Sequence, residues 1–98
     1  MKQNKNQIKN TLNQYRELFK KNYNVEELGV FGSFARGDNT QTSDVDILVR
    51  FSQPLGFFKF IELENYLTGL LGRKVDLVTE KALKPAIKRD VLREVMYV

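Results

Sequence analysis

One stretch near the middle of the chain most constrains how it can fold. A short apolar run from Leu28 to Phe31 leads into Gly32-Ser33, and ten residues later comes Asp44-Val45-Asp46. An apolar run of this length predicts a short buried strand, and a glycine directly after it lets the backbone turn sharply and approach a ligand closely. The sequence therefore predicts a strand that ends in a small-residue turn, with two carboxylates in the segment that follows.

From Asp44 to Phe51 every second residue is apolar and the residues between are Asp44, Asp46, Leu48 and Arg50, which predicts a second strand with one apolar face and one partly charged face. The residues of that apolar face are Val45, Ile47, Val49 and Phe51. Asp44 and Asp46 then share the other face, about 6–7 Å apart along the strand. Two like charges so close are unfavourable without cations, and Asp is uncommon in strands. The pair suits a site with two metal ions, although an exposed strand face would carry the same pattern.

Asp76 stands in a third strand signal, Lys74 to Val78, where it can lie beside Asp44 and Asp46 and complete a carboxylate triad. The alternative is an Asp at a strand edge, paired with a neighbouring basic residue, Lys74 or Arg73. The chain has no histidine and no cysteine, so acid–base and metal chemistry fall to carboxylates, whose oxygens favour Mg²⁺ or Mn²⁺ over zinc. With a turn able to hold phosphate, these residues predict a site for phosphoryl or nucleotidyl transfer.

Three stripes of apolar residues at helical spacing accompany the strands. The first predicts one N-terminal helix over about residues 6–22. The second predicts a helix from Phe57 to Leu71 that ends at Gly72, with Phe57 and Phe60 in the core. The third follows Pro85. Helices and strands together predict an α/β fold.

Composition bounds the remaining possibilities. A length of 98 residues with 42% hydrophobic residues predicts one domain, 1–98, with a modest core. No apolar run approaches twenty residues and the first ten residues are rich in Lys, Asn and Gln, so we expect no membrane span and a cytoplasmic location. The net charge of +4 gathers in residues 1–25 and 81–98. The lysines alternate with Asn and Gln rather than with stacking aromatics, which favours a partner-protein surface over nucleic acid.

At this point the sequence resembles the minimal nucleotidyltransferases, small prokaryotic members of the DNA polymerase beta-like superfamily. The match rests on Gly32-Ser33, the ten-residue spacing, Asp44-Val45-Asp46 and the segment from Lys74 to Val78. It extends to further positions: Gly37, Ser43, Leu71-Gly72-Arg73-Lys74, Lys84-Pro85 and Tyr97-Val98. The resemblance spans about residues 26–98, the expected catalytic core. It implies an α/β (α+β) nucleotidyltransferase fold, with a mixed sheet of three or four strands flanked by helices.

The resemblance also implies a set of residue roles. Gly32 and Ser33 would hold the triphosphate of ATP, and Arg36 would add charge near it unless it is simply a surface arginine. Asp44 and Asp46 would bind two Mg²⁺ ions. Asp76 would bind the ion at which an acceptor hydroxyl attacks the α-phosphorus, with release of pyrophosphate.

The resemblance further implies a partner. Minimal nucleotidyltransferases are commonly encoded beside a HEPN-domain ribonuclease and act as its antitoxin, and characterised examples attach AMP to a tyrosine of that toxin. A hetero-oligomer of antitoxin and toxin is therefore expected. Two alternatives stay open: an antitoxin that binds without catalysis, and a transferase that acts on RNA or a small molecule. The three carboxylates argue against the first, and the lack of the extra domains of larger relatives argues against the second.

Overall fold

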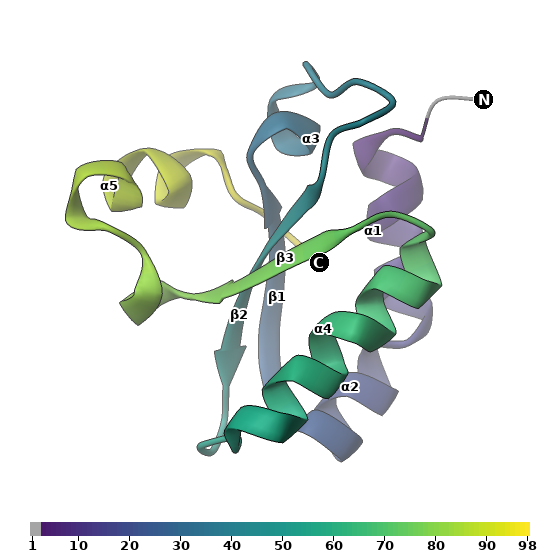
Figure 1. Cartoon of the computed structure of the whole chain (residues 1–98), viewed down its shortest axis with the longest axis vertical. Coiled ribbons are helices and arrows are strands. Elements are labelled where there is room, and N and C mark those ends of the chain that lie inside the picture. Colours follow the sequence, from purple (N-terminus) through teal and green to yellow (C-terminus); the bar gives the residue numbers. More distant parts are fainter. Residues whose placement is uncertain (1–2) are drawn as a thin grey trace.

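The computed structural model describes residues 3–98 and shows a four-stranded sheet with helices on both faces (Figure 1). The strands lie in the order β3-β2-β1-β4. They are β1 (Val25–Phe31), β2 (Val45–Phe51), β3 (Val75–Thr79) and β4 (Met96–Tyr97). The helices are α1 (Lys5–Gln14), α2 (Arg16–Tyr23), α3 (Ser33–Arg36), α4 (Phe57–Leu71), the 3₁₀ helix η1 (Glu80–Ala82) and α5 (Pro85–Glu94).

The pairing of the strands places the predicted acidic residues side by side. β1 and β2 form an antiparallel pair in which Phe31 lies opposite Asp46. β2 and β3 run parallel, and Asp46 lies opposite Asp76. β4 pairs antiparallel with β1 beside Gly29 and Val30. The sheet is therefore mixed, which confirms the predicted fold class, although the two-residue β4 is too short for any alternation to reveal it.

The main hydrophobic core lies on one face of the sheet, under α1, α2 and α4. The predicted alternation on β2 is confirmed there, because Val45, Ile47 and Val49 are at most 1% exposed. The helices contribute side chains that are fully buried: Ile8, Leu12, Phe19, Leu63 and Leu67. A smaller cluster on the opposite face joins the sheet to α5 and consists of Phe31, Leu48, Leu83 and Val91. Asp46, the acidic residue of β2, shares this second face.

The N-terminal segment corrects the prediction of a single helix over about residues 6–22. Two helices, α1 and α2, replace it, with a break at Tyr15, whose φ of −108° and ψ of 10° are not helical. The Tyr15 N–H donates to the carbonyl of Leu12, a tightened i→i−3 turn. Apolar spacing stays helical across the break because Leu12 and Phe19 both reach the core. No glycine or proline marks the break in the sequence.

The helix predicted from Phe57 to Leu71 is present as α4 and ends as expected at Gly72, whose φ of +66° is left-handed. One expectation for it was wrong: Phe57 is 72% exposed, because it lies in the first turn, beyond the edge of the core. Phe60 is partly buried and packs edge-on against Phe51. Even this longest helix, like every other in residues 3–98, falls short of the length and apolarity needed to cross a membrane.

Candidate active site

The turn after β1 depends on glycine. Gly32 has a φ of +73° and a ψ of −149°, a conformation that residues with a Cβ rarely adopt. A Cβ at this position would also overlap the carboxylate oxygen Oδ2 of Asp46. Ser33 then begins α3, a single helical turn that ends at Gly37. Glycine at position 32 therefore allows the end of β1 to lie directly against a carboxylate of β2.

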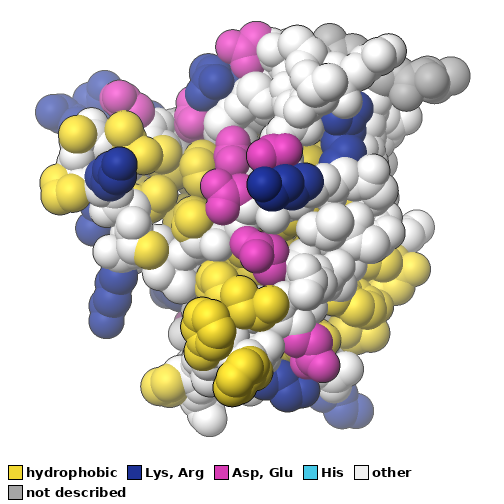
Figure 2. Space-filling model, in the orientation of Figure 1, with side chains coloured by type: hydrophobic (Ala, Val, Ile, Leu, Met, Phe, Trp, Pro, Cys, Tyr) yellow, Lys and Arg dark blue, Asp and Glu magenta, His cyan; other side chains and the backbone are white. Residues whose placement is uncertain are grey.

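A surface cavity of about 460 Å³ lies at this end of the β1–β2 pair. Its walls include most of the predicted site residues: Gly32, Ser33, Arg36, Asp44 and Asp46. Figure 2 shows acidic side chains gathered in the middle of this face, between α5 and β3, with basic side chains next to them. Asp76 does not line the cavity, but its register opposite Asp46 puts it on the neighbouring strand at the same end of the sheet.

Asp46 has the most perturbed charge in this region. It is partly buried, and burial raises the pKa of its carboxyl to about 6, with further contributions from the negative charges of Asp76 and Asp44. Arg36 acts in the opposite direction, and Glu94 adds to the increase. The structure thus brings Asp44 and Asp76 close enough to Asp46 for their negative charges to disfavour its ionised form. Such repulsion is relieved by a bound cation or by a proton.

The alternative in which Asp76 pairs with Arg73 receives no support from the contacts of that arginine. Arg73 donates from Nη1 to the backbone carbonyls of Gln41, at 2.7 Å, and Ser43, at 3.2 Å. Its Nε donates to the side chain of Gln3. Arg73 therefore braces the loop that leads into Asp44, and Asp76 is exposed.

The donors at this end of the sheet fit a magnesium ion in kind. Mg²⁺ in nucleotide sites is usually held by one or two carboxylates together with substrate phosphates and water, and carboxylates are the available protein ligands here. Within residues 3–98, no three acidic side chains converge closely enough to hold a metal by themselves. A bound cation would therefore need additional oxygen ligands from the substrate, or a change of side-chain rotamer that brings Asp44, Asp46 or Asp76 closer together.

Sequence reasoning missed the contribution of α5. Asp90, Glu94 and Ile87 complete the wall of the cavity. The Glu94 carboxylate accepts a hydrogen bond from the Gly32 N–H, at 2.9 Å, and pairs with Arg36 at 3.2 Å. Arg36 also pairs with Asp38, and its pKa is raised, first by the hydrogen bond to Asp38 and then by that to Glu94. No short-range sequence pattern predicts these contacts, because Glu94 lies 62 positions after Gly32 in the chain.

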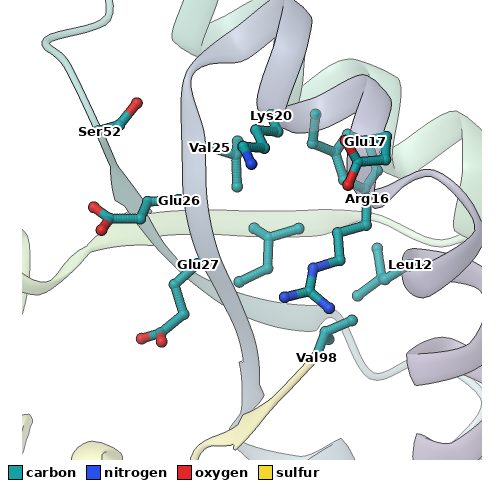
Figure 3. A pocket seen from close by; sticks show the side chains of 11 residues that line it. Leu12, Arg16, Glu17, Lys20, Val25, Glu26, Glu27, Ser52 and Val98 are labelled. Carbon is teal, nitrogen blue, oxygen red and sulfur yellow. The ribbon is translucent and has the colours of Figure 1, made fainter.

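A second cavity, of about 450 Å³, lies between α2 and the outer edge of β1 (Figure 3). Side chains of both signs line it, among them Arg16, Lys20, Glu17, Glu26 and Glu27. Val98 closes one side of it. None of the predicted site residues belongs to this cavity, so the acidic cavity beside Gly32 is the candidate active site.

A mixed sheet that holds a glycine turn at the end of one strand and an Asp-x-Asp pair at the start of the next is the framework of a nucleotidyltransferase. The chain belongs to the family described as "Nucleotidyltransferase domain", whose model matches residues 12–98. The protein adenylyltransferase MntA of Thermococcus cleftensis is similar to it, with 48% identity over 92 residues that cover 94% of this chain and 93% of that protein. The resemblance predicted from the sequence and the assignment to the transferases are thus confirmed.

Solved structures give the same answer. A candidate minimal nucleotidyltransferase superposes with a TM-score of 0.80 at 32% identity and covers 96% of this chain and 95% of its own. A toxin–antitoxin crystal structure with AMP-PNP reaches 0.71 at 26% identity, over 87% of this chain and 69% of that one. A complex of the MNT antitoxin with the tri-AMPylated HEPN toxin of Shewanella oneidensis reaches 0.66 at 22% identity, over 92% and 70%, and shows the fold alone.

Proposed function

We propose that this chain is a magnesium-dependent protein adenylyltransferase that transfers AMP from ATP to a tyrosine of a cognate HEPN ribonuclease toxin and thereby acts as its antitoxin. The observation that carries this proposal is the cavity in which Gly32 and Ser33 lie beside Asp44 and Asp46. The similarity to a protein adenylyltransferase over nearly the whole chain supports the acceptor class. The toxin–antitoxin neighbours support the partner.

The roles follow from what each group can contribute. The Gly32 N–H and the Ser33 hydroxyl are donors suited to phosphate oxygens, and Arg36 adds a positive charge at the same wall. Asp44 and Asp46 would hold Mg²⁺ together with the triphosphate, with Asp76 beside them. Bound Mg²⁺ neutralises phosphate charge and lowers the pKa of a coordinated oxygen.

The acceptor hydroxyl is supplied from outside the chain. No tyrosine of the described residues lines the cavity, and Ser33 is the one hydroxyl residue on its walls. In the transfer, the tyrosine oxygen bonds to the α-phosphorus, the bond from this phosphorus to the bridging oxygen breaks, and pyrophosphate leaves. The acidic groups beside the attacking oxygen, with Asp76 the candidate at the strand edge, favour loss of the hydroxyl proton.

The test is a transfer assay in which the acceptor is the product of the gene adjacent to that of this chain, expected to be a HEPN protein. We expect ATP labelled at the α-phosphate, with Mg²⁺, to label the toxin, and mass spectrometry to place AMP on a tyrosine. EDTA should abolish the labelling. Label on RNA alone would favour a nucleic acid transferase. Neutralisation of the toxin without any label would favour an antitoxin that acts by binding, and either result would contradict the proposal.

A further inference from the structure

The last residue of α5 occupies the donors that the proposed function gives to a phosphate. Glu94 Oε1 accepts the Gly32 N–H at 2.9 Å, and Oε2 lies 3.2 Å from Arg36 Nη1. The Glu94 side chain is 22% exposed, so the contacts are partly shielded from water. A carboxylate and a phosphate present the same kind of anionic oxygen to such donors. Glu94 therefore stands where a phosphate oxygen would stand.

Local forces do not favour Glu94 at this position. It ends α5, where the negative end of the helix dipole disfavours an anion. Asp90 lies four residues earlier on the same helix, and like charges at this spacing are destabilising. The contacts with Gly32 and Arg36 offset these costs. The position of Glu94 is thus explained by the turn after β1 rather than by its own helix.

The charge of the cavity gives these contacts a consequence for ligand binding. Four acidic residues line it (Asp44, Asp46, Asp90 and Glu94), against a single basic residue, Arg36. Arg36 is already engaged by Glu94 and by Asp38. A triphosphate that enters must therefore overcome the repulsion of Glu94 and release Arg36 from it.

We propose that Glu94 is an internal competitor of the nucleotide triphosphate: its carboxylate holds Gly32 and Arg36 in the free protein and leaves them when a phosphate takes its place. This inference rests on the function proposed above, because it assigns the same donors to the nucleotide. Glu94 thereby sets the affinity for nucleotide. It also keeps the glycine turn ordered before the nucleotide arrives, because the Gly32 N–H has a partner in both states.

The test compares Glu94→Gln with Asp90→Asn. Glutamine keeps the length of the side chain and an oxygen that can accept the Gly32 N–H, but it loses the charge that attracts Arg36. Asp90→Asn removes the same charge from the same helix and the same cavity, without any contact to Gly32 or Arg36 among the hydrogen bonds of residues 3–98. Calorimetric titration with AMP-PNP and Mg²⁺ gives the affinity of each protein without turnover.

We expect Glu94→Gln to bind AMP-PNP about fivefold or more tightly than the unmodified chain, the scale of a typical coupling between competing sites. Asp90→Asn should tighten binding by less than Glu94→Gln does, because Asp90 is exposed, its charge is largely screened and it occupies neither donor. In the unmodified chain, the ¹H–¹⁵N signal of Gly32 should move on addition of AMP-PNP as its acceptor changes.

Four results would overturn the inference. An equal gain in both variants would mean that only net charge matters, and weaker binding by Glu94→Gln would mean that Glu94 assists the nucleotide. A Gly32 amide signal that does not move while AMP-PNP binds would mean that the carboxylate stays in place. Absence of AMP-PNP binding in the unmodified chain and in both variants would contradict the proposed function as well, whereas the first three results leave that function intact.

Discussion

The two faces of β2 differ in what their side chains contact, although they belong to the same seven residues. Toward α1, α2 and α4, Ile47 and its neighbours at alternate positions are enclosed by apolar side chains. Toward α5, Asp46 lies beside other carboxylates and only Leu48 belongs to an apolar cluster. Burial of apolar area on the first face stabilises the strand, while mutual repulsion on the second costs free energy. Because successive side chains of a strand point to opposite faces, β2 contributes to the core with one set of residues and to the candidate site with the other.

The largest expected effect would come from the acidic face. We expect Asp44→Ala with Asp46→Ala to reduce AMP transfer by at least about a thousandfold, or about 4 kcal/mol in the barrier, because both proposed metal ligands are lost. The free energy of unfolding should stay the same or rise, since the change removes repulsion. Transfer assays and urea unfolding measure the two quantities.

A matched control removes an acid elsewhere. Glu62 on α4 pairs with Lys59 at the surface, and Glu62→Ala should alter neither transfer nor unfolding by more than about 0.5 kcal/mol. Full transfer activity in the double variant would rule out Asp44 and Asp46 as the metal ligands. A lower free energy of unfolding in the double variant would mean that the acidic face of β2 also stabilises the fold.

The opposite result is expected on the buried face. Ile47 is fully buried, and Ile47→Ala should lower the free energy of unfolding by about 2–5 kcal/mol, through lost apolar contacts and a cavity. Protein that remains folded should still transfer AMP. Arg50→Ala on the exposed part of β2 is the control and should cost less than about 1 kcal/mol. A cost below that of the control would show that the core tolerates a cavity at Ile47 without loss.

The turn at Gly32, between β1 and β2, matters for both the fold and the candidate site, so Gly32→Ala should lower both stability and activity. A positive φ combined with a ψ of −149° costs a residue with a Cβ about 1–3 kcal/mol, and the new Cβ would also displace the Asp46 carboxylate. We therefore expect lower stability and lower transfer activity together. Gly69 lies inside α4 with open space around it, so Gly69→Ala should stabilise the protein by about 0.4–1 kcal/mol. Unchanged AMP transfer by Gly32→Ala would show that the conformation of the turn at Gly32 is not needed for activity.

Features encoded by short-range patterns could be predicted from the sequence. The alternation around Asp46 fixed which side of β2 is buried, and Gly72 marked the end of α4. The spacing between Gly32 and Asp44 indicated the site because strand, turn and strand follow one another in the chain. These predictions required only local geometry.

Features that depend on tertiary contacts could not be predicted in this way. Glu94 reaches Gly32 only because α5 folds back across the sheet, and a glutamate at the end of a basic helix has no sequence signal of its own. The two-residue strand β4 likewise depends on its pairing with β1, far away along the chain. The break at Tyr15 has no glycine or proline to mark it in the sequence. Asp76 was placed on the correct strand, and its role as a metal ligand stays a prediction.

The smallest expected effect concerns pH, in protein kept free of metal with EDTA. The pKa of Asp46 is raised from 3.8 to about 6, so the folded state binds its proton more tightly than the unfolded state does. The contribution of Asp46 to stability is therefore full below about pH 3.8 and is lost as the pH rises through about 6. Burial, Asp76 and Asp44 cause this loss, Glu94 adds to it and Arg36 reduces it.

Asp46→Asn isolates this contribution, because the amide resembles the protonated carboxyl at every pH. Urea unfolding of both proteins between pH 3.5 and pH 7.5 should show the variant to be more stable than the unmodified chain at the upper end, with a difference that shrinks toward the lower end. Other carboxylates titrate in both proteins and cancel in the difference. A difference that does not change with pH would mean that neither burial nor the neighbouring carboxylates raise the pKa of Asp46, and the contrast between the two faces of β2 would then be one of shape rather than of charge.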